Sequence, residues 1–201
     1  MMSRCHATTV LPMIAGALCL ATPSWADFQT GLRAYNFADY ATAIRELRPY
    51  ADQGDAAAQF YLGAMYDKGK GTQQDHAQAV FWYRKAAEQG HAEAQVNLGT
   101  LYLEGGGVPR DYTEALKWLQ AAAVKGQSLA YDKLGHIHAK GLGVPKDYVQ
   151  AHMWYNLAAA KGDFGAAMAA MARDSLAKKM TPAQVAEAQR LAQEWHSTNK
   201  Q

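Results

Sequence analysis

A serine and a lysine near the C-terminus have the spacing of a catalytic element. Ser175 and Lys178 form an S-x-x-K motif, the nucleophile-and-lysine pair of penicillin-interacting serine enzymes. Those enzymes also need a Ser-Asp-Asn element and a Lys-Thr-Gly strand, and the sequence contains neither. We therefore predict that this chain is not an enzyme.

Three histidines and one aspartate could in principle bind a metal ion. On a helix, residues i and i+2 point to different faces, so His136 and His138 cannot easily share an ion, with or without His152. Asp132 and His136 are four residues apart and share a face, but two ligands fall short of the three or four of a zinc site. The sequence predicts a surface histidine beside an aspartate, with no metal and no cofactor.

These residues belong to a chain that repeats itself every 36 residues, at 56–91, 92–127 and 128–163. Periods of 20 to 50 residues indicate a solenoid or an array of stacked units, which forms an extended concave binding surface more often than a catalytic cleft. Identical residues recur in register: Leu62, Leu98 and Leu134; Gly63, Gly99 and Gly135; Asp75, Asp111 and Asp147; Trp82, Trp118 and Trp154.

Each unit contains two segments with helical spacing of apolar residues. In the second unit these segments include Leu98 and Trp118, and the loop GGGVPRD separates them. Its glycines can take the positive φ that ends a helix, and Asp111 is placed to cap the next helix. Glu114, three residues on, completes a capping-box pattern that also occurs at Asp75 and Asp147. The first loop, GKGTQQD, departs from the GVP-basic-Asp pattern, which predicts a different shape for it.

Two kinds of residue are expected to hold the units together. The repeated glycine in the middle of the first helix costs about 0.5–1 kcal/mol relative to alanine, so it predicts close approach of the paired helix. The tryptophan column recurs in the same register as its apolar neighbours, which indicates core rather than a glycan-binding platform. No unit can bury its own apolar stripe, so the units must stack.

We predict an all-α fold, an α-solenoid of about five stacked antiparallel helix pairs in a right-handed superhelix. The expected organisation is a signal peptide, a tetratricopeptide-like N-terminal cap, three repeats and a C-terminal capping helix pair, at residues 1–26, 27–55, 56–91, 92–127, 128–163 and 164–201.

The first 26 residues have the layout of a secretory leader. Arg4 lies in a short polar region, an apolar run from Val10 to Leu20 follows, and Ser24-Trp25-Ala26 is a small-x-small cleavage site. We expect cleavage near Ala26 and a periplasmic or secreted protein without stable membrane insertion; an uncleaved N-terminal anchor is the alternative. Both cysteines lie in this leader, so the mature chain would use no disulfide.

Charge gives no sign of a polyanionic partner. The chain has 20 basic and 18 acidic residues, and cleavage would remove only Arg4 from the charged set. A nearly neutral chain with interspersed signs lacks the electrostatic footprint of a nucleic-acid-binding or anionic-membrane-binding protein. We predict no nucleic-acid partner, and the sequence does not indicate an oligomeric state.

The repeats resemble the Sel-one-like repeat family, relatives of the tetratricopeptide repeat with a longer glycine-bearing loop. The resemblance rests on AEAQVNLGTLYLEGGGVPRDYTEALKWLQAAAVKG and its two neighbours. It implies a helical-repeat fold and a role as an adaptor or scaffold for protein complexes. Some exported members carry a disulfide in each repeat and bind penicillin-like ligands; this chain lacks those cysteines, so that property is not carried over.

Positions that vary while their neighbours repeat are the candidate binding residues. They lie on the first helices, which line the concave face in tetratricopeptide-like superhelices, and the alternative is that they are only solvated surface. We predict an exported adaptor, scaffold or regulator that binds a peptide or protein there; the alternative is a cell-wall protein that binds glycan or positions a wall enzyme, with Tyr61 or Tyr131 exposed beside the groove. The predicted binding residues are Phe60, Ala64, Asp67, Lys68, Glu93, Val96, Thr100, Glu104, Leu129, Asp132, His136 and Lys140.

Overall fold

The computed structural model describes residues 25–199, which form ten helices and no strand. The predicted leader falls on residues 1–26 and so lies almost wholly outside the described range. The helices are α1 (Trp25–Asn36), α2 (Tyr40–Asp52), α3 (Ala56–Lys68), α4 (His76–Glu88), α5 (Ala92–Glu104), α6 (Tyr112–Val124), α7 (Ser128–Lys140), α8 (Tyr148–Ala159), α9 (Ala166–Ala177) and α10 (Pro182–Thr198).

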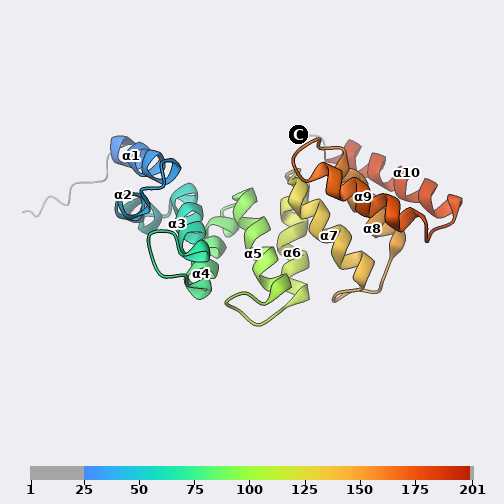
Figure 1. Ribbon diagram of the computed structural model, residues 1–201, viewed down its shortest axis with the longest axis horizontal. Coiled ribbons are helices and arrows are strands. Elements are labelled where there is room, and N and C mark those ends of the chain that lie inside the picture. Colours follow the sequence, from blue (N-terminus) through green and yellow to red (C-terminus); the bar gives the residue numbers. More distant parts are fainter. Residues whose placement is uncertain (1–24, 200–201) are drawn as a thin grey trace, which may run out of the picture.

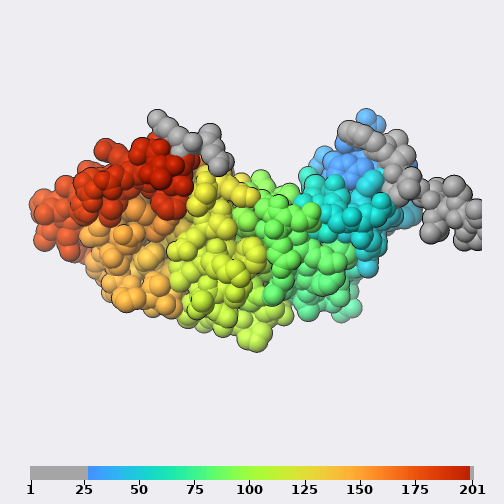
Figure 2. Space-filling model, turned by 180° about the vertical axis from the view of Figure 1, so that it is seen from behind, coloured from blue at the N-terminus to red at the C-terminus, as the bar shows by residue number. Residues whose placement is uncertain are grey.

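Consecutive helices pack against each other along an elongated array (Figures 1 and 2). The tightest pairs are α3 with α4, α5 with α6 and α7 with α8, and each pair then contacts the first helix of the next unit. At the C-terminal end α9 and α10 both pack against α8. The predicted all-α solenoid is confirmed. Among residues 25–199, no helix is long and apolar enough to span a membrane.

The core runs through the array rather than sitting inside any one unit. Trp82, Trp118 and Trp154 are between 2% and 9% exposed, which confirms that the tryptophan column belongs to the core. Trp82 packs with residues of the first two helices, whereas the other two tryptophans belong to the cluster of the later units. Stacking therefore buries the apolar surface that a single helix pair would leave in water.

The mid-helix glycines allow the close helix contact that the sequence predicted. A Cβ atom built on Gly63 would lie 2.6 Å from the Tyr83 ring, and one on Gly135 would lie 2.8 Å from the Tyr155 ring. Side chains do not approach so closely, so only glycine leaves room for these rings. Each ring comes from the second helix of the same unit.

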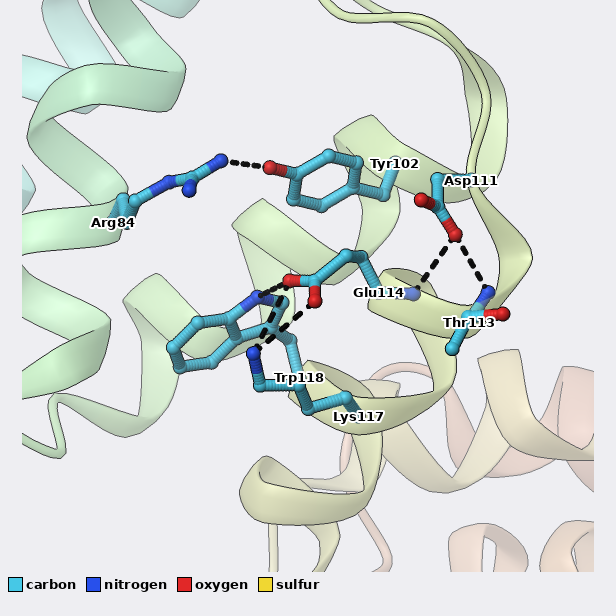
Figure 3. Close-up of polar contacts among 7 residues, drawn as sticks. All are labelled: Arg84, Tyr102, Asp111, Thr113, Glu114, Lys117 and Trp118. Carbon is cyan, nitrogen blue, oxygen red and sulfur yellow. Dashed lines mark hydrogen bonds and ion pairs between the residues drawn. The ribbon is translucent and has the colours of Figure 1, made fainter.

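Aspartates cap the second helices through their side chains, but the second hydrogen bond of a capping box, back to the aspartate amide, does not form within residues 25–199. The Asp111 carboxylate accepts hydrogen bonds from the Thr113 and Glu114 amides at 2.9 and 3.1 Å (Figure 3). The Asp111 amide, which a capping box would pair with Glu114, instead donates to the Tyr102 carbonyl at 3.0 Å. Glu114 accepts from Trp118 Nε1 at 2.9 Å, so it anchors a core ring instead. The predicted cap is confirmed, but the predicted return bond from Glu114 is wrong, because the Asp111 amide already donates to the Tyr102 carbonyl that closes the loop.

Loop glycines fix how one unit sits on the next. Gly71, Gly107 and Gly143 have φ between 70° and 73°, and a Cβ atom on each would collide with the first residue of the preceding unit's second helix. The loop containing Gly71 was expected to differ in shape. It has the same positive φ and the same closing bond, from the Asp75 amide to the Tyr66 carbonyl at 2.9 Å, because glycine spacing and the aspartate decide the loop while the GVP residues do not.

Candidate functional site

Three pockets that contain predicted binding residues border α7, and the first lies between α5 and α7. This polar pocket has a volume of about 550 Å³ and contains three of the predicted binding residues, Glu104, Asp132 and His136. Its remaining lining comes from the end of α5, the following loop, the start of α6, α7 and its following loop, and α8: Leu103, Arg110, Tyr112, Lys133, Leu142 and Tyr155.

Two charged side chains of the polar pocket form an ion pair, and a third is hydrogen-bonded. Lys133 Nζ lies 3.2 Å from Glu104 Oε1, and Arg110 Nη2 donates to the Glu104 carbonyl at 3.3 Å. The Asp132 carboxylate, in contrast, makes no hydrogen bond or ion pair within residues 25–199. Burial, together with the Asp132 charge, raises the pKa of Tyr155 to about 12, so its hydroxyl stays protonated. The pocket thus offers one unpaired carboxylate beside a neutral phenol.

The second pocket, here the apolar pocket, lies between the starts of α7 and α9 and shares Asp132 with the first. Its volume is about 430 Å³. Leu129 is 50% exposed, Met168 69% exposed, and Phe164 is fully exposed. Large apolar side chains that gather at the surface of a soluble protein mark an interaction site more often than isolated ones do. The other lining residues are Ser128, Ala158, Asp163 and Gly165.

The third pocket, here the lysine pocket, lies between the ends of α7 and α9 and shares Tyr155 with the first. It has a volume of about 380 Å³. Ser175 of the S-x-x-K motif is in its lining, whereas Lys178 is not, and no hydrogen bond joins the two within the described chain. Its lining also includes Ala139, Lys140, Lys146, Tyr148, Ala172, Leu176 and Lys179.

The predicted residues of the first repeat are more buried than those of the third. Phe60 is half-buried and stacks on the His91 ring, with centroids 4.6 Å apart. Asp67 is only 7% exposed, and its carboxylate pairs with Lys68 at 2.7 Å and His76 at 3.1 Å. The pair with His76 ties the end of α3 to the start of α4. Asp67 therefore has a clear structural role, while Lys68 remains exposed.

Other predicted residues divide between buried and exposed positions. Ala64 and Val96 are 9% and 3% exposed, so they offer little surface to a ligand. The Thr100 hydroxyl donates to the Val96 carbonyl at 2.9 Å. Glu93 is exposed and lies 3.3 Å from His91 Nδ1. The pockets gather the predicted residues of α7 and the end of α5, and whether any of the twelve binds a ligand stays a prediction.

Sequence reasoning missed the residues that other elements contribute to the same pockets. Arg110 and Lys146 come from the inter-helix loops, Tyr155 from a second helix, and Phe164 and Met168 from the C-terminal unit. None of these residues occupies a varying position on the first helix of a repeat, so the repeat pattern does not indicate them. Within residues 25–199, no group of three or more histidine, cysteine, aspartate or glutamate side chains could hold a metal ion.

Comparisons with known proteins agree with the repeat architecture. The family model described as the Sel1 repeat matches residues 56–91, 92–126 and 128–163. A Sel1 repeat protein from Oxalobacter formigenes has a similar crystal structure, with 39% identity, a TM-score of 0.63, and coverage of 68% of this chain and 55% of that one. A search of curated proteins found no match.

A second solved structure extends the similarity over more of the chain. It is a protective antigen of uropathogenic Escherichia coli strains that displays an SLR fold, with 31% identity, a TM-score of 0.51, and coverage of 86% of this chain and 45% of that one. The present chain thus spans about half the length of the two solved structures. Sel1 repeats generally mediate contacts between proteins.

Proposed function

This chain is a member of the Sel1 repeat family, and we propose that it is an exported, non-enzymatic adaptor that binds a peptide or a partner protein on its first helices. The observation that carries the proposal is that the polar, apolar and lysine pockets all border α7. They are open, the polar pocket shares a lining residue with each of the other two, and together they contain five of the predicted residues, namely Glu104, Leu129, Asp132, His136 and Lys140.

The chemistry of these pockets supports binding of a polypeptide. Exposed apolar side chains, an unpaired carboxylate and unpaired lysines lie within one tract, and a polypeptide can satisfy all three kinds of group. The glycan-binding alternative expected Tyr61 or Tyr131 to be exposed, and Tyr131 is 5% exposed and stacks on Trp154 with centroids 5.8 Å apart. Of the two aromatic residues named for that alternative, Tyr131 is therefore buried.

Affinity capture from bacterial envelope extract tests the adaptor proposal. The bait is the full chain with a C-terminal tag, and the groove variant is Asp132→Ala with His136→Ala. The matched control is Glu88→Ala with Gln120→Ala, which removes one acidic and one polar side chain from exposed positions on α4 and α6. Circular dichroism checks that both variants keep the wild-type helicity.

The expected result is a protein that wild type and control retain and the groove variant loses. Equal capture by both variants would place the binding surface elsewhere on the solenoid, and no capture above background would contradict the adaptor proposal. Export is tested separately by cell fractionation and N-terminal sequencing. A mature chain beginning near Asp27 in the periplasm or medium is expected, and an intact leader on a cytoplasmic protein would contradict export.

A further inference from the structure

The lysine pocket is an unneutralised cluster of positive charge. Lys140 ends α7, Lys146 lies in the following loop, and Lys179 follows α9, so three separate segments bring their amines to one pocket. No acidic residue lines it, and none of the three lysines forms an ion pair within residues 25–199. A lysine at the end of a helix is common because it offsets the helix dipole. That effect does not explain Lys146, which lies outside any helix.

The Tyr148 phenol lies beside these lysines. Lys146 Nζ lies 4.8 Å from the centroid of the Tyr148 ring. A hydrogen bond with Lys146, followed by the charges of Lys146, Lys179 and Lys140, lowers the pKa of the Tyr148 hydroxyl. An anion placed here would meet amines and the hydroxyls of Tyr148 and Ser175.

The apolar pocket has the opposite electrostatic character. Asp132 and Asp163 line it beside Leu129, Phe164 and Met168. Asp163 Oδ1 accepts the Gly165 amide at 3.0 Å, but neither carboxylate forms an ion pair in the described part of the chain. A bulky apolar group flanked by a cation would satisfy both the exposed side chains and the two carboxylates.

The two pockets occupy opposite ends of the same pair of helices. The starts of α7 and α9 line the apolar pocket, and their ends line the lysine pocket, so the two helices run in the same direction. The polar pocket borders both, because it shares Asp132 with one and Tyr155 with the other. A helix of 13 residues such as α7 is about 20 Å long, which about six extended residues span.

We propose that this tract binds an extended peptide segment of about six residues with a fixed charge order. A bulky apolar residue and a basic residue occupy the apolar pocket, and acidic side chains occupy the lysine pocket. The polar pocket, whose Lys133 and Glu104 already pair, contacts the middle of the peptide through hydrogen bonds. This inference rests on the proposed adaptor function and specifies the partner's chemistry.

Synthetic peptides of equal composition test the charge order. The ordered probes are fluorescein-labelled Lys-Leu-Ser-Ala-Glu-Glu and its reverse, since either chain direction fits the tract, and the shuffled probe is Glu-Leu-Lys-Ala-Glu-Ser. Fluorescence anisotropy with the full chain measures the dissociation constants. We expect one ordered peptide to bind at least about five-fold more tightly than the shuffled one, and the difference to shrink at high salt because exposed charges are screened.

Charge-reversal variants assign each end of the peptide. Lys179→Glu should weaken the preferred peptide about five-fold, and a peptide with lysines in place of its glutamates should bind this variant better than it binds wild type. Asp132→Lys should also weaken the preferred peptide, and a peptide with glutamate in place of its lysine should bind this variant better than it binds wild type. The matched control is Lys178→Glu, an adjacent exposed lysine outside the pocket lining, which should change binding by less than about two-fold.

Equal affinities for ordered and shuffled peptides would overturn the inference, as would loss of binding in Lys178→Glu as large as in Lys179→Glu. Absence of peptide binding up to about 1 mM, where the binding free energy is only about −4 kcal/mol, would also overturn it. If affinity capture still yields a partner that depends on Asp132 and His136, only the charge order fails. If capture fails as well, the adaptor function fails with it.

Discussion

Replacing Gly63 by alanine should destabilise the protein, although alanine is the better helix former. The added Cβ would lie 2.6 Å from Tyr83 Cδ1 and 2.8 Å from Cε1. Tyr83 is 1% exposed, so its ring cannot turn away without disturbing the core. Overpacking of this kind costs about 1–3 kcal/mol, and the helix-propensity gain offsets about 0.5–1 kcal/mol. The net expectation is a loss of roughly 0–2.5 kcal/mol in the free energy of unfolding.

Gly165→Ala provides the matched control for the same chemical change. Gly165 has φ −82° and ψ −15°, a conformation that alanine adopts readily, and the nearest atom to an added Cβ is Asp163 Oδ1 at 3.5 Å. This variant should be neutral or more stable by up to about 1 kcal/mol. Urea unfolding followed by far-ultraviolet circular dichroism measures both. The reasoning is refuted if Gly63→Ala is as stable as Gly165→Ala.

Three further changes give distinct results by urea unfolding. Asp111→Ala removes the cap of α6 and should cost about 1 kcal/mol. Trp118→Ala truncates a core ring and should cost about 3–5 kcal/mol; a cost below 1 kcal/mol would show that the tryptophan column is not core. Burial, then the Arg173 charge, lowers the pKa of His152 below 6.5, so the unfolded chain takes up its proton first and stability falls as pH drops below about 6.5. His152→Leu should flatten that acid-side loss, and an unchanged slope between pH 7.5 and 5 would contradict the assignment.

Much of the fold could be predicted from the sequence because the same residue pattern occurs in three consecutive units. The 36-residue period, the glycines at fixed positions and the recurring aspartates predict two helices per unit and the capping of each second helix. The reciprocal half of the capping box could not be predicted, because it depends on where the Asp111 amide points once the loop closes on Tyr102.

The candidate site was only partly predictable. Variation along first helices identifies Asp132 and His136, which do meet in one pocket. The same rule selects Asp67 and Val96, which the folded chain buries. Position along a helix does not reveal which side chain a neighbouring unit covers.

The sequence by itself determined the period, the helix pairs and the glycines that let rings pack closely, because these depend on local propensity and spacing. Only the tertiary structure decided which charges remain unpaired. Lys140, Lys146 and Lys179 belong to three separate segments of the chain, and they line one pocket because α7 and α9 both pack against α8. Asp132 likewise lines the apolar pocket as well as the polar pocket because the fold places Phe164 and Met168 near it. Contacts between units set this surface chemistry, and the repeat pattern does not encode it.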